Sequence, residues 1–201
     1  MKSIQFLGRS VIPSKIVCVG RNYAEHISEL GNEVPESMVL FVKPNSAISD
    51  ALHAGKSEEH HFEAELSFLV AKGSYAGIGL GIDVTRRGVQ AALKSKGLPW
   101  ERSKAFDGSA VFSEFVEYHN QNLGLELIVN GRVAQRAEAG MMIHSPDAIL
   151  EEIQTFMTLE DGDIVMTGTP GGVGAFYRGD QFQGKVCSDD TVLVEREWRA
   201  Q

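Results

Sequence analysis

The segment HFEAELSFLV, from His61 to Val70, carries two carboxylates two positions apart in a run that otherwise has the pattern of a β-strand. Successive strand residues point to opposite faces, so Glu63 and Glu65 would project to the same side. Two carboxylates this close repel each other, and burying them is costly unless a cation lies between them. The pair is therefore either a solvated strand face or part of a site for a hard cation such as Mg²⁺ or Mn²⁺.

A third acid, Asp83, ends the glycine-rich apolar run GIGLGID directly before an expected helix. Taken alone, an aspartate in this position is more often a helix cap, and an E-x-E pair is more often solvated. Three carboxylates together would supply the oxygen ligands that Mg²⁺ or Mn²⁺ prefers. His26 and Glu29 form another candidate pair, three residues apart in an expected helix, although spacing alone favours an exposed pair.

The elements that would position these side chains are mostly short strands bounded by glycine, proline or charged residues. Strands are expected over residues 14–20, 38–43, 63–71 and 163–167, and the Asn130-Gly131 pair predicts a hairpin turn. Helices are expected over residues 22–30, 85–96 and 146–157, the last with Ser145 as N-cap and Pro146 in its first turn. Without repeats or a linker, residues 1–201 are predicted to form one α+β, mainly β domain.

Composition narrows the class of partner. The formal charge of -8 disfavours nucleic acid or an anionic membrane surface, so a small metabolite is the expected ligand. The two cysteines, Cys18 and Cys187, lack the spacing of a zinc site and are too few for a disulfide scaffold. No signal peptide or membrane span is evident, and a cytoplasmic location is predicted.

Six segments in the same order resemble the fumarylacetoacetate hydrolase family, and within it the short, single-domain acylpyruvate hydrolases. They are VGRNYAEHISE (19–29), LFVKP (40–44), FEAEL (62–66), DVTRRGVQ (83–90), GLPWERSKAF (97–106) and LEDGDIVMTGTPGGVG (159–174). The likeness covers nearly the whole chain. It implies a mixed, rolled β-sandwich, a homodimer, and a divalent cation, commonly Mg²⁺, held by an E-x-E pair and a later aspartate.

The resemblance assigns a role to each matching residue. The metal ligands would be Glu63, Glu65 and Asp83. The catalytic residues would be His26 and Glu29, as a dyad acting on water, and Lys104, facing the oxyanion of the substrate. The substrate-binding residues would be Arg21, Arg87, Gln90 and Thr169.

Charge and departures from the family pattern bear on substrate choice. Three carboxylates around a dication leave about one negative charge, which an anionic substrate would worsen without nearby cations. The candidates to offset that charge are Arg21, Lys43, Arg87 and Lys104. Many relatives have Ala-Arg-Asp where this chain has Arg86, Arg87 and Gly88, so substrate preference near this helix is left open.

The implied activity is metal-dependent hydrolysis of a carbon–carbon bond in a 2,4-dioxo acid, such as an acylpyruvate or fumarylpyruvate, to pyruvate and a carboxylic acid. Relatives that decarboxylate or tautomerise oxaloacetate, or isomerise 2-hydroxy-diene-dioates, are an alternative because one metal-bound enolate serves all these reactions. A catalytically silent protein that binds an oxo acid or a metal is a second alternative. A nucleotide enzyme is disfavoured because the MTGTPGGVG loop lacks the lysine of a phosphate loop.

Overall fold

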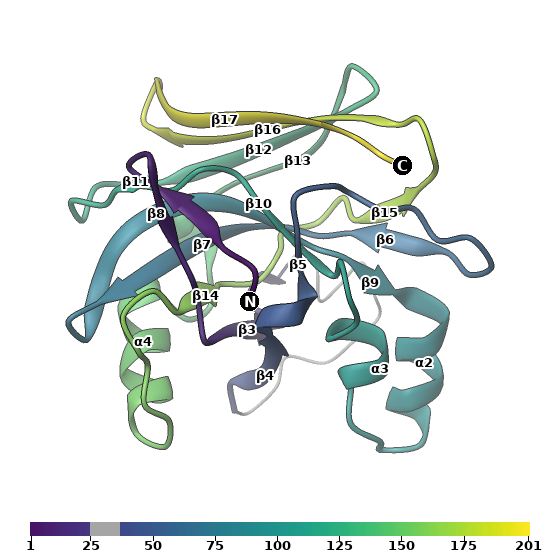
Figure 1. Ribbon diagram of the computed structural model, residues 1–201, viewed down its shortest axis with the longest axis horizontal. Helices are drawn as coiled ribbons and strands as arrows, with labels where there is room; N and C mark the ends of the chain where they lie inside the picture. Colours follow the sequence, from purple (N-terminus) through teal and green to yellow (C-terminus); the bar gives the residue numbers. More distant parts are fainter. Residues whose placement is uncertain (25–36) are drawn as a thin grey trace.

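Two β-sheets stacked face to face form the body of the protein, and the helices lie on the side away from the smaller sheet (Figure 1). The structure is a computed structural model that describes residues 1–24 and 37–201. The larger sheet contains β3 (Lys15–Gly20), β4 (Val39–Pro44), β5 (Ile48–Ser49), β7 (Ala64–Ala71), β8 (Ser74–Asp83), β10 (Ala110–Phe112), β11 (Val116–Glu117) and β14 (Ile164–Met166). Its order is β4-β3-β14-β7-β8-β10-β5, with β11 paired to β8.

The smaller sheet is antiparallel and covers the larger one. It contains β12 (Gly124–Val129), β13 (Arg132–Glu138), β16 (Gln181–Ser188) and β17 (Thr191–Arg199), in the order β13-β12-β16-β17. Two minor sheets complete the β structure: β1 (Ile4–Phe6) with β2 (Arg9–Val11), and β15 (Gly174–Phe176) with β6 (His60–Phe62) and β9 (Thr85–Arg86). The described helices are α2 (Arg87–Ser95), α3 (Glu101–Lys104) and α4 (Pro146–Gln154), with 3₁₀ turns η1 (Asn45–Ala47) and η2 (Ala139–Met141).

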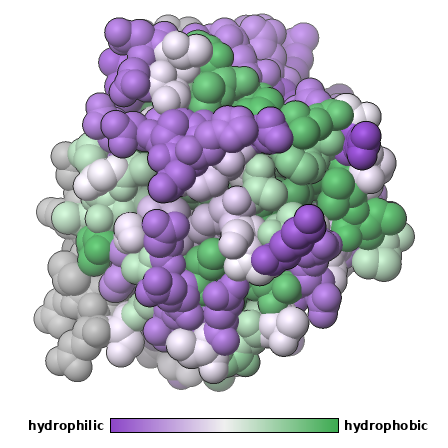
Figure 2. All heavy atoms as spheres, turned by 90° about the vertical axis from the view of Figure 1, so that its left-hand side faces the viewer, coloured by the Kyte–Doolittle hydropathy of each residue, from purple (hydrophilic) through white to green (hydrophobic). Residues whose placement is uncertain are grey.

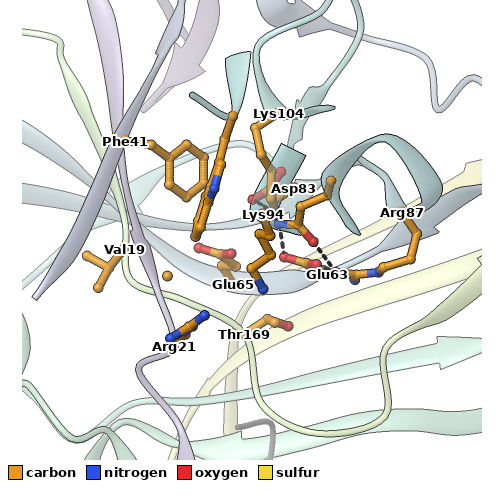
Figure 3. A pocket seen from close by; sticks show the side chains of 13 residues that line it. Val19, Arg21, Phe41, Glu63, Glu65, Asp83, Arg87, Lys94, Lys104 and Thr169 are labelled. Carbon is orange, nitrogen blue, oxygen red and sulfur yellow. Dashed lines mark hydrogen bonds and ion pairs between the residues drawn. The ribbon is translucent and has the colours of Figure 1, made fainter. Parts of the chain in front are cut away.

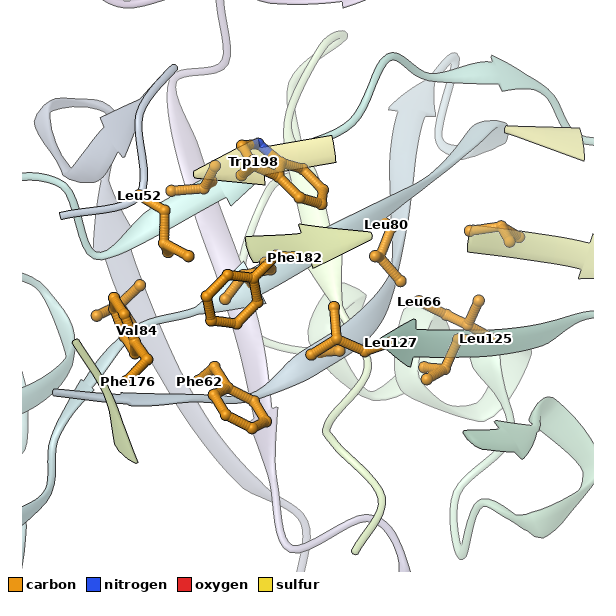
Figure 4. Packing of buried hydrophobic residues seen from close by; sticks show 14 of the residues in the cluster. Leu52, Phe62, Leu66, Leu80, Val84, Leu125, Leu127, Phe176, Phe182 and Trp198 are labelled. Carbon is orange, nitrogen blue, oxygen red and sulfur yellow. The ribbon is translucent and has the colours of Figure 1, made fainter. Parts of the chain in front are cut away.

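The main hydrophobic core lies between the two large sheets (Figure 4). Leu66 and Leu80 of the larger sheet meet Leu127 and Phe182 of the smaller sheet, and all four are buried. Gly184 of β16 belongs to this interface because a Cβ atom there would collide with Leu80. The close approach fixes how the smaller sheet lies over β8, the strand that ends in Asp83.

The rest of the described surface gives little indication of function by itself. Hydrophilic residues cover much of the face that includes α4 and the turn between β7 and β8, with hydrophobic areas between them (Figure 2). Exposed apolar side chains such as Leu7 and Ile12 are ordinary on a protein surface. Among the described residues, no helix is long and apolar enough to cross a membrane.

The predicted fold class and strands are confirmed. The four expected strands correspond to β3, β4, β7 and β14, and the hairpin joins β12 to β13. Asn130 and Gly131 have φ angles of 50° and 78°, as the predicted turn requires. Ser145 caps α4 by accepting a hydrogen bond from the Ala148 backbone N–H at 3.3 Å.

The predicted helix boundaries need correction. Helix 85–96 begins later, at Arg87, because Thr85 and Arg86 instead pair with β6 as a short strand. Helix 146–157 ends at Gln154. Helix 22–30 lies largely outside the described residues, and Tyr23 forms an isolated β-bridge with Met142.

Candidate active site

Three acidic side chains converge where two central strands meet. Glu63 lies between β6 and β7, Glu65 lies on β7, and Asp83 ends β8. The antiparallel pairing of β7 and β8, with a 2.8 Å hydrogen bond from the Asp83 N–H to the Glu63 carbonyl, brings the acids together. One carboxylate oxygen from each lies within 4.8 Å of the others, and all three residues are buried. The E-x-E pair is therefore not a solvated strand face.

Basic side chains reach two of these acids. The Lys104 Nζ lies 2.7 Å from Glu63 Oε2 and 2.7 Å from Asp83 Oδ2. Lys43 Nζ lies 2.8 Å from Asp83 Oδ1 and also donates to the Lys104 carbonyl. Arg87 approaches the same carboxylate of Glu63 from the helix side, at 2.5 Å from Oε1. Lys104 and Lys43 are buried, so both lysines belong to the site rather than to the surface.

Glu65 is held differently. Among the described residues it forms no ion pair, and its Oε2 accepts a 2.8 Å hydrogen bond from the Gly168 backbone N–H. Burial, followed by repulsion from Asp83 and Glu63, raises the pKa of Glu65 well above its ordinary value. For Lys104, burial by itself lowers the pKa, but Asp83 and Glu63 outweigh it and the net pKa is raised.

This arrangement fits a divalent cation. Three buried carboxylates within reach of one point supply the hard oxygen donors that Mg²⁺ and Mn²⁺ prefer. Glu65, buried without a cationic partner among the described side chains, is the kind of group that such an ion would neutralise.

A pocket opens beside the acids (Figure 3). Besides the triad, it is lined by predicted residues from several elements, namely Arg21, Arg87, Gln90, Lys104 and Thr169. Val19, Phe41 and Trp100 add apolar wall. The structure therefore brings most of the predicted site residues to one pocket, while His26 and Glu29 lie outside the described residues.

The spacing of residues along α2 explains how this helix forms part of the pocket wall. Arg87 and Gln90 are three residues apart on this helix, and Arg87 donates to Gln90 Oε1 at 2.7 Å. The same guanidinium binds Glu63, so it links the helix to the acidic triad. Gln90 is buried, so it belongs to the pocket wall and not to the solvent-facing surface of α2.

Thr169 is engaged with the protein as well as exposed to the pocket. Its hydroxyl donates to the Ala64 carbonyl at 2.9 Å and accepts from the Gln135 side-chain amide at 2.8 Å. The hydroxyl proton of Thr169 therefore already has an acceptor, and the predicted role of Thr169 in substrate binding stays a prediction.

Besides the apolar wall, two polar residues of the site were missing from the sequence interpretation. Lys94 lies four residues after Gln90 and faces the pocket, so the helical spacing of Arg87, Gln90 and Lys94 is a signal that points to it. Gln135 comes from β13 in the other sheet and contacts the backbone between the two glutamates. No local pattern marks it, because its role depends on the packing of the two sheets.

Comparison with known proteins places this geometry in a family. Residues 15–197 match the model of the fumarylacetoacetate (FAA) hydrolase C-terminal domain. The chain is 41% identical to oxaloacetate tautomerase YcgM of Escherichia coli (strain K12), over 91% of this chain and 92% of that protein. It is 37% identical to the mitochondrial oxaloacetate tautomerase FAHD1 of Homo sapiens, over 85% and 86% of the two chains.

A solved structure gives the same result for the fold. A fumarylpyruvate hydrolase from Pseudomonas aeruginosa, crystallised with Mn²⁺ and pyruvate, superimposes with a TM-score of 0.89 at 30% identity. The match covers 99% of this chain and 95% of that one. The chain belongs to the fumarylacetoacetate hydrolase family, whose members include hydrolases and tautomerases.

Proposed function

We propose that this protein is a divalent-metal-dependent tautomerase of oxaloacetate, with Mg²⁺ or Mn²⁺ as the cofactor. The observation that carries the proposal is the buried Glu63, Glu65 and Asp83 triad, surrounded by basic side chains in a chain 41% identical to an oxaloacetate tautomerase. The comparisons support this alternative better than carbon–carbon hydrolysis, the leading expectation from the sequence.

Conversion of the enol to the keto form moves one proton from the oxygen on C2 to the carbon C3, while the C2–C3 double bond becomes the C2–O double bond, and no carbon–carbon bond is cleaved. The barrier comes from the negative charge that develops on the enolate oxygen. A bound dication would act as the Lewis acid that stabilises this charge. Glu63, Glu65 and Asp83 would hold this ion, and the Lys104 ammonium lies 2.7 Å from an oxygen of both Glu63 and Asp83.

The chain supplies further groups for binding and orientation. The Lys104 ammonium adds a fixed positive charge beside the reacting end of an oxo acid, where enolate charge develops. Arg87 and Gln90, hydrogen-bonded to each other, form a rigid wall from which a carboxylate or an enol oxygen can be oriented. Phe41 and Trp100 add an apolar part of the wall, which would keep water away from the reacting groups.

Hydrolysis of a 2,4-dioxo acid is the second candidate. It is favoured by the similarity to the fumarylpyruvate hydrolase, and by the His26 and Glu29 pair in the family-like segment of the sequence. Hydrolysis needs a group that activates water, whereas tautomerisation consumes none. This difference separates the two activities experimentally.

The test compares products. The purified protein is given oxaloacetate, acetylpyruvate or fumarylpyruvate with Mg²⁺, beside the Glu63→Gln variant. A tautomerase equilibrates the oxaloacetate enol and keto forms, and leaves pyruvate at the level of the spontaneous reaction. Pyruvate released from the two dioxo acids would instead identify a hydrolase, and pyruvate released only from oxaloacetate would identify a decarboxylase.

The other expectations from the sequence remain part of the proposal. A small 2-oxo acid is the expected ligand, the homodimer implied by the resemblance is testable by light scattering after size-exclusion chromatography, and the cytoplasm is the expected location. A monomer in solution would remove the homodimer without affecting the site.

A further inference from the structure

Lys94 lines the pocket, but it does not contact the acidic triad through an ion pair and it was not among the predicted site residues. It lies on α2, seven residues after Arg87 and four after Gln90, so the three side chains share one helix face. Figure 3 shows its ammonium directed into the pocket, on the side of Arg21 and Thr169. The residue is half-buried, with its ammonium 5.4 Å from the centre of the Trp100 ring.

The electrostatic surroundings of Lys94 are unlike those of the other lysines in the site. Lys104 and Lys43 each lie within 2.8 Å of a carboxylate oxygen, whereas Lys94 forms no ion pair with any described residue. Burial, then repulsion from Arg21 and Arg87, lowers its pKa. A lysine ammonium that points into a pocket and is repelled by neighbouring cations is stabilised when an anion enters the pocket.

The charge of the whole pocket also favours an anionic ligand. Four basic side chains line it, against three carboxylates, in a chain whose net charge is -8. A divalent cation on the triad would make the pocket more positive still. One carboxylate of a ligand, bound at the cation, would leave Lys94 without a counter-charge. A second carboxylate on the same ligand would supply it.

We propose that Lys94 binds the carboxylate at the far end of the substrate from the metal, and thereby selects 2-oxo dicarboxylates over 2-oxo monocarboxylates. The proposal rests on the proposed function, whose substrate is such a dicarboxylate. Arg87 and Lys104 are less suited to this task because both are already held by Glu63. The flexible four-carbon stem of Lys94 lets its ammonium follow ligands of different length.

Binding of two unreactive ligands tests Lys94 without relying on turnover. L-Malate and L-lactate both present a 2-hydroxy acid to the metal, but only malate has a second carboxylate. Calorimetry on the Mg²⁺-loaded protein should give tighter binding of malate than of lactate. Lys94→Gln should weaken malate binding about tenfold, which corresponds to about 1.4 kcal/mol, and lactate binding by less than about twofold, since only malate loses a charge-assisted hydrogen bond.

Two further variants serve as controls. Lys94→Arg keeps the positive charge and should retain most of the preference for malate. Lys96→Gln removes an exposed lysine at the end of the same helix and should leave both affinities unchanged. In steady-state assays, Lys94→Gln should raise the KM for oxaloacetate while kcat stays within about threefold, because only ground-state and transition-state binding at the remote end is lost.

Equal loss of malate and lactate binding in Lys94→Gln would overturn the proposal, because the residue would then act on the pocket as a whole. Unchanged malate binding, or a fall in kcat without a change in KM, would overturn it too. Failure of the proposed function has a different signature. The malate preference would then persist and depend on Lys94 although oxaloacetate is not tautomerised, which supports dicarboxylate binding alone.

Discussion

Gln135 holds the backbone of Ala64, the residue between the two glutamates of the acidic triad. Its Oε1 accepts a 2.9 Å hydrogen bond from the Ala64 N–H. Its amide nitrogen donates to Thr169 Oγ1 at 2.8 Å, and Thr169 in turn donates to the Ala64 carbonyl at 2.9 Å. A side chain from the smaller sheet therefore fixes both polar backbone groups between Glu63 and Glu65.

Gln135→Met keeps much of the side-chain volume and removes every hydrogen bond that the Gln135 side chain forms. The buried Ala64 N–H loses its acceptor, which should lower the free energy of unfolding by about 1–3 kcal/mol. Mg²⁺ affinity should fall by about tenfold or more, as for other residues that orient metal ligands. Chemical denaturation and calorimetry measure the two effects.

Gln5→Met is the matched control, because Gln5 is exposed on β1. It should change neither quantity. Wild-type Mg²⁺ affinity in Gln135→Met would contradict a positioning role for Gln135, even if stability falls.

Asp163 joins the starts of two adjacent parallel strands, β3 and β14. Its Oδ1 accepts from the Ser14 N–H at 2.9 Å and from the Ser14 hydroxyl at 2.7 Å, and its Oδ2 lies 2.5 Å from Lys15 Nζ. In Asp163→Asn an amide NH₂ group would replace Oδ2. This group is a donor, and it would face the Lys15 ammonium and the Glu160 N–H, which are donors too. The free energy of unfolding at neutral pH should therefore fall by about 3 kcal/mol. Asp107→Asn, at an exposed site, should have no effect on denaturation.

The pH dependence of stability tests the same network. Burial by itself raises the pKa of Asp163, but hydrogen bonds from Lys15 and Ser14 outweigh it, and the pKa is held below its ordinary value. The contribution of the carboxylate is therefore complete above about pH 4, and is lost as the pH falls through the lowered pKa. The stability difference between wild type and Asp163→Asn should shrink below about pH 4. A constant difference down to pH values near that pKa would contradict the carboxylate as its source.

His26→Ala separates the two candidate activities. Activation of water is needed for hydrolysis and not for tautomerisation, so any release of pyruvate from a dioxo acid above the spontaneous rate should fall about 100-fold or more. Oxaloacetate tautomerisation should persist within about tenfold of wild type, because the triad and Lys104 are untouched. Both rates come from one preparation. Equal losses would mean that His26 takes part in a step common to both reactions.

The residues that could be predicted from the sequence are those with a local signal. The alternating pattern of residues 61–70 placed Glu63 and Glu65 on one side, Asp83 marked a strand end, and Asn130-Gly131 indicated the hairpin. The metal-binding role of the three acids came from the family resemblance. The family resemblance supplied Lys104, Arg87 and Gln90, which the structure brings to the same pocket.

Other features depend on contacts between distant segments. Thr85 and Arg86 have the pattern of a helix start, yet they pair with His61 and His60 as a strand, because tertiary pairing outweighs local propensity. Gln135 is a site residue only because the second sheet packs over Ala64. Lys94 has a helical-spacing signal but no chemical one, since a lysine on a helix is usually a surface charge.

The most direct measurement follows the ultraviolet absorbance of the oxaloacetate enol as it decays to the keto form. The protein is assayed after EDTA treatment, after restoration with Mg²⁺ or Mn²⁺, and as the Glu65→Gln variant beside Glu151→Gln, an exposed control on α4. We predict faster decay that EDTA and Glu65→Gln abolish, that Mg²⁺ or Mn²⁺ restores to wild type, and that Glu151→Gln leaves intact. Decay at the spontaneous rate with the metal-loaded protein, or acceleration that survives both EDTA and Glu65→Gln, would contradict a metal-dependent tautomerase built on this triad.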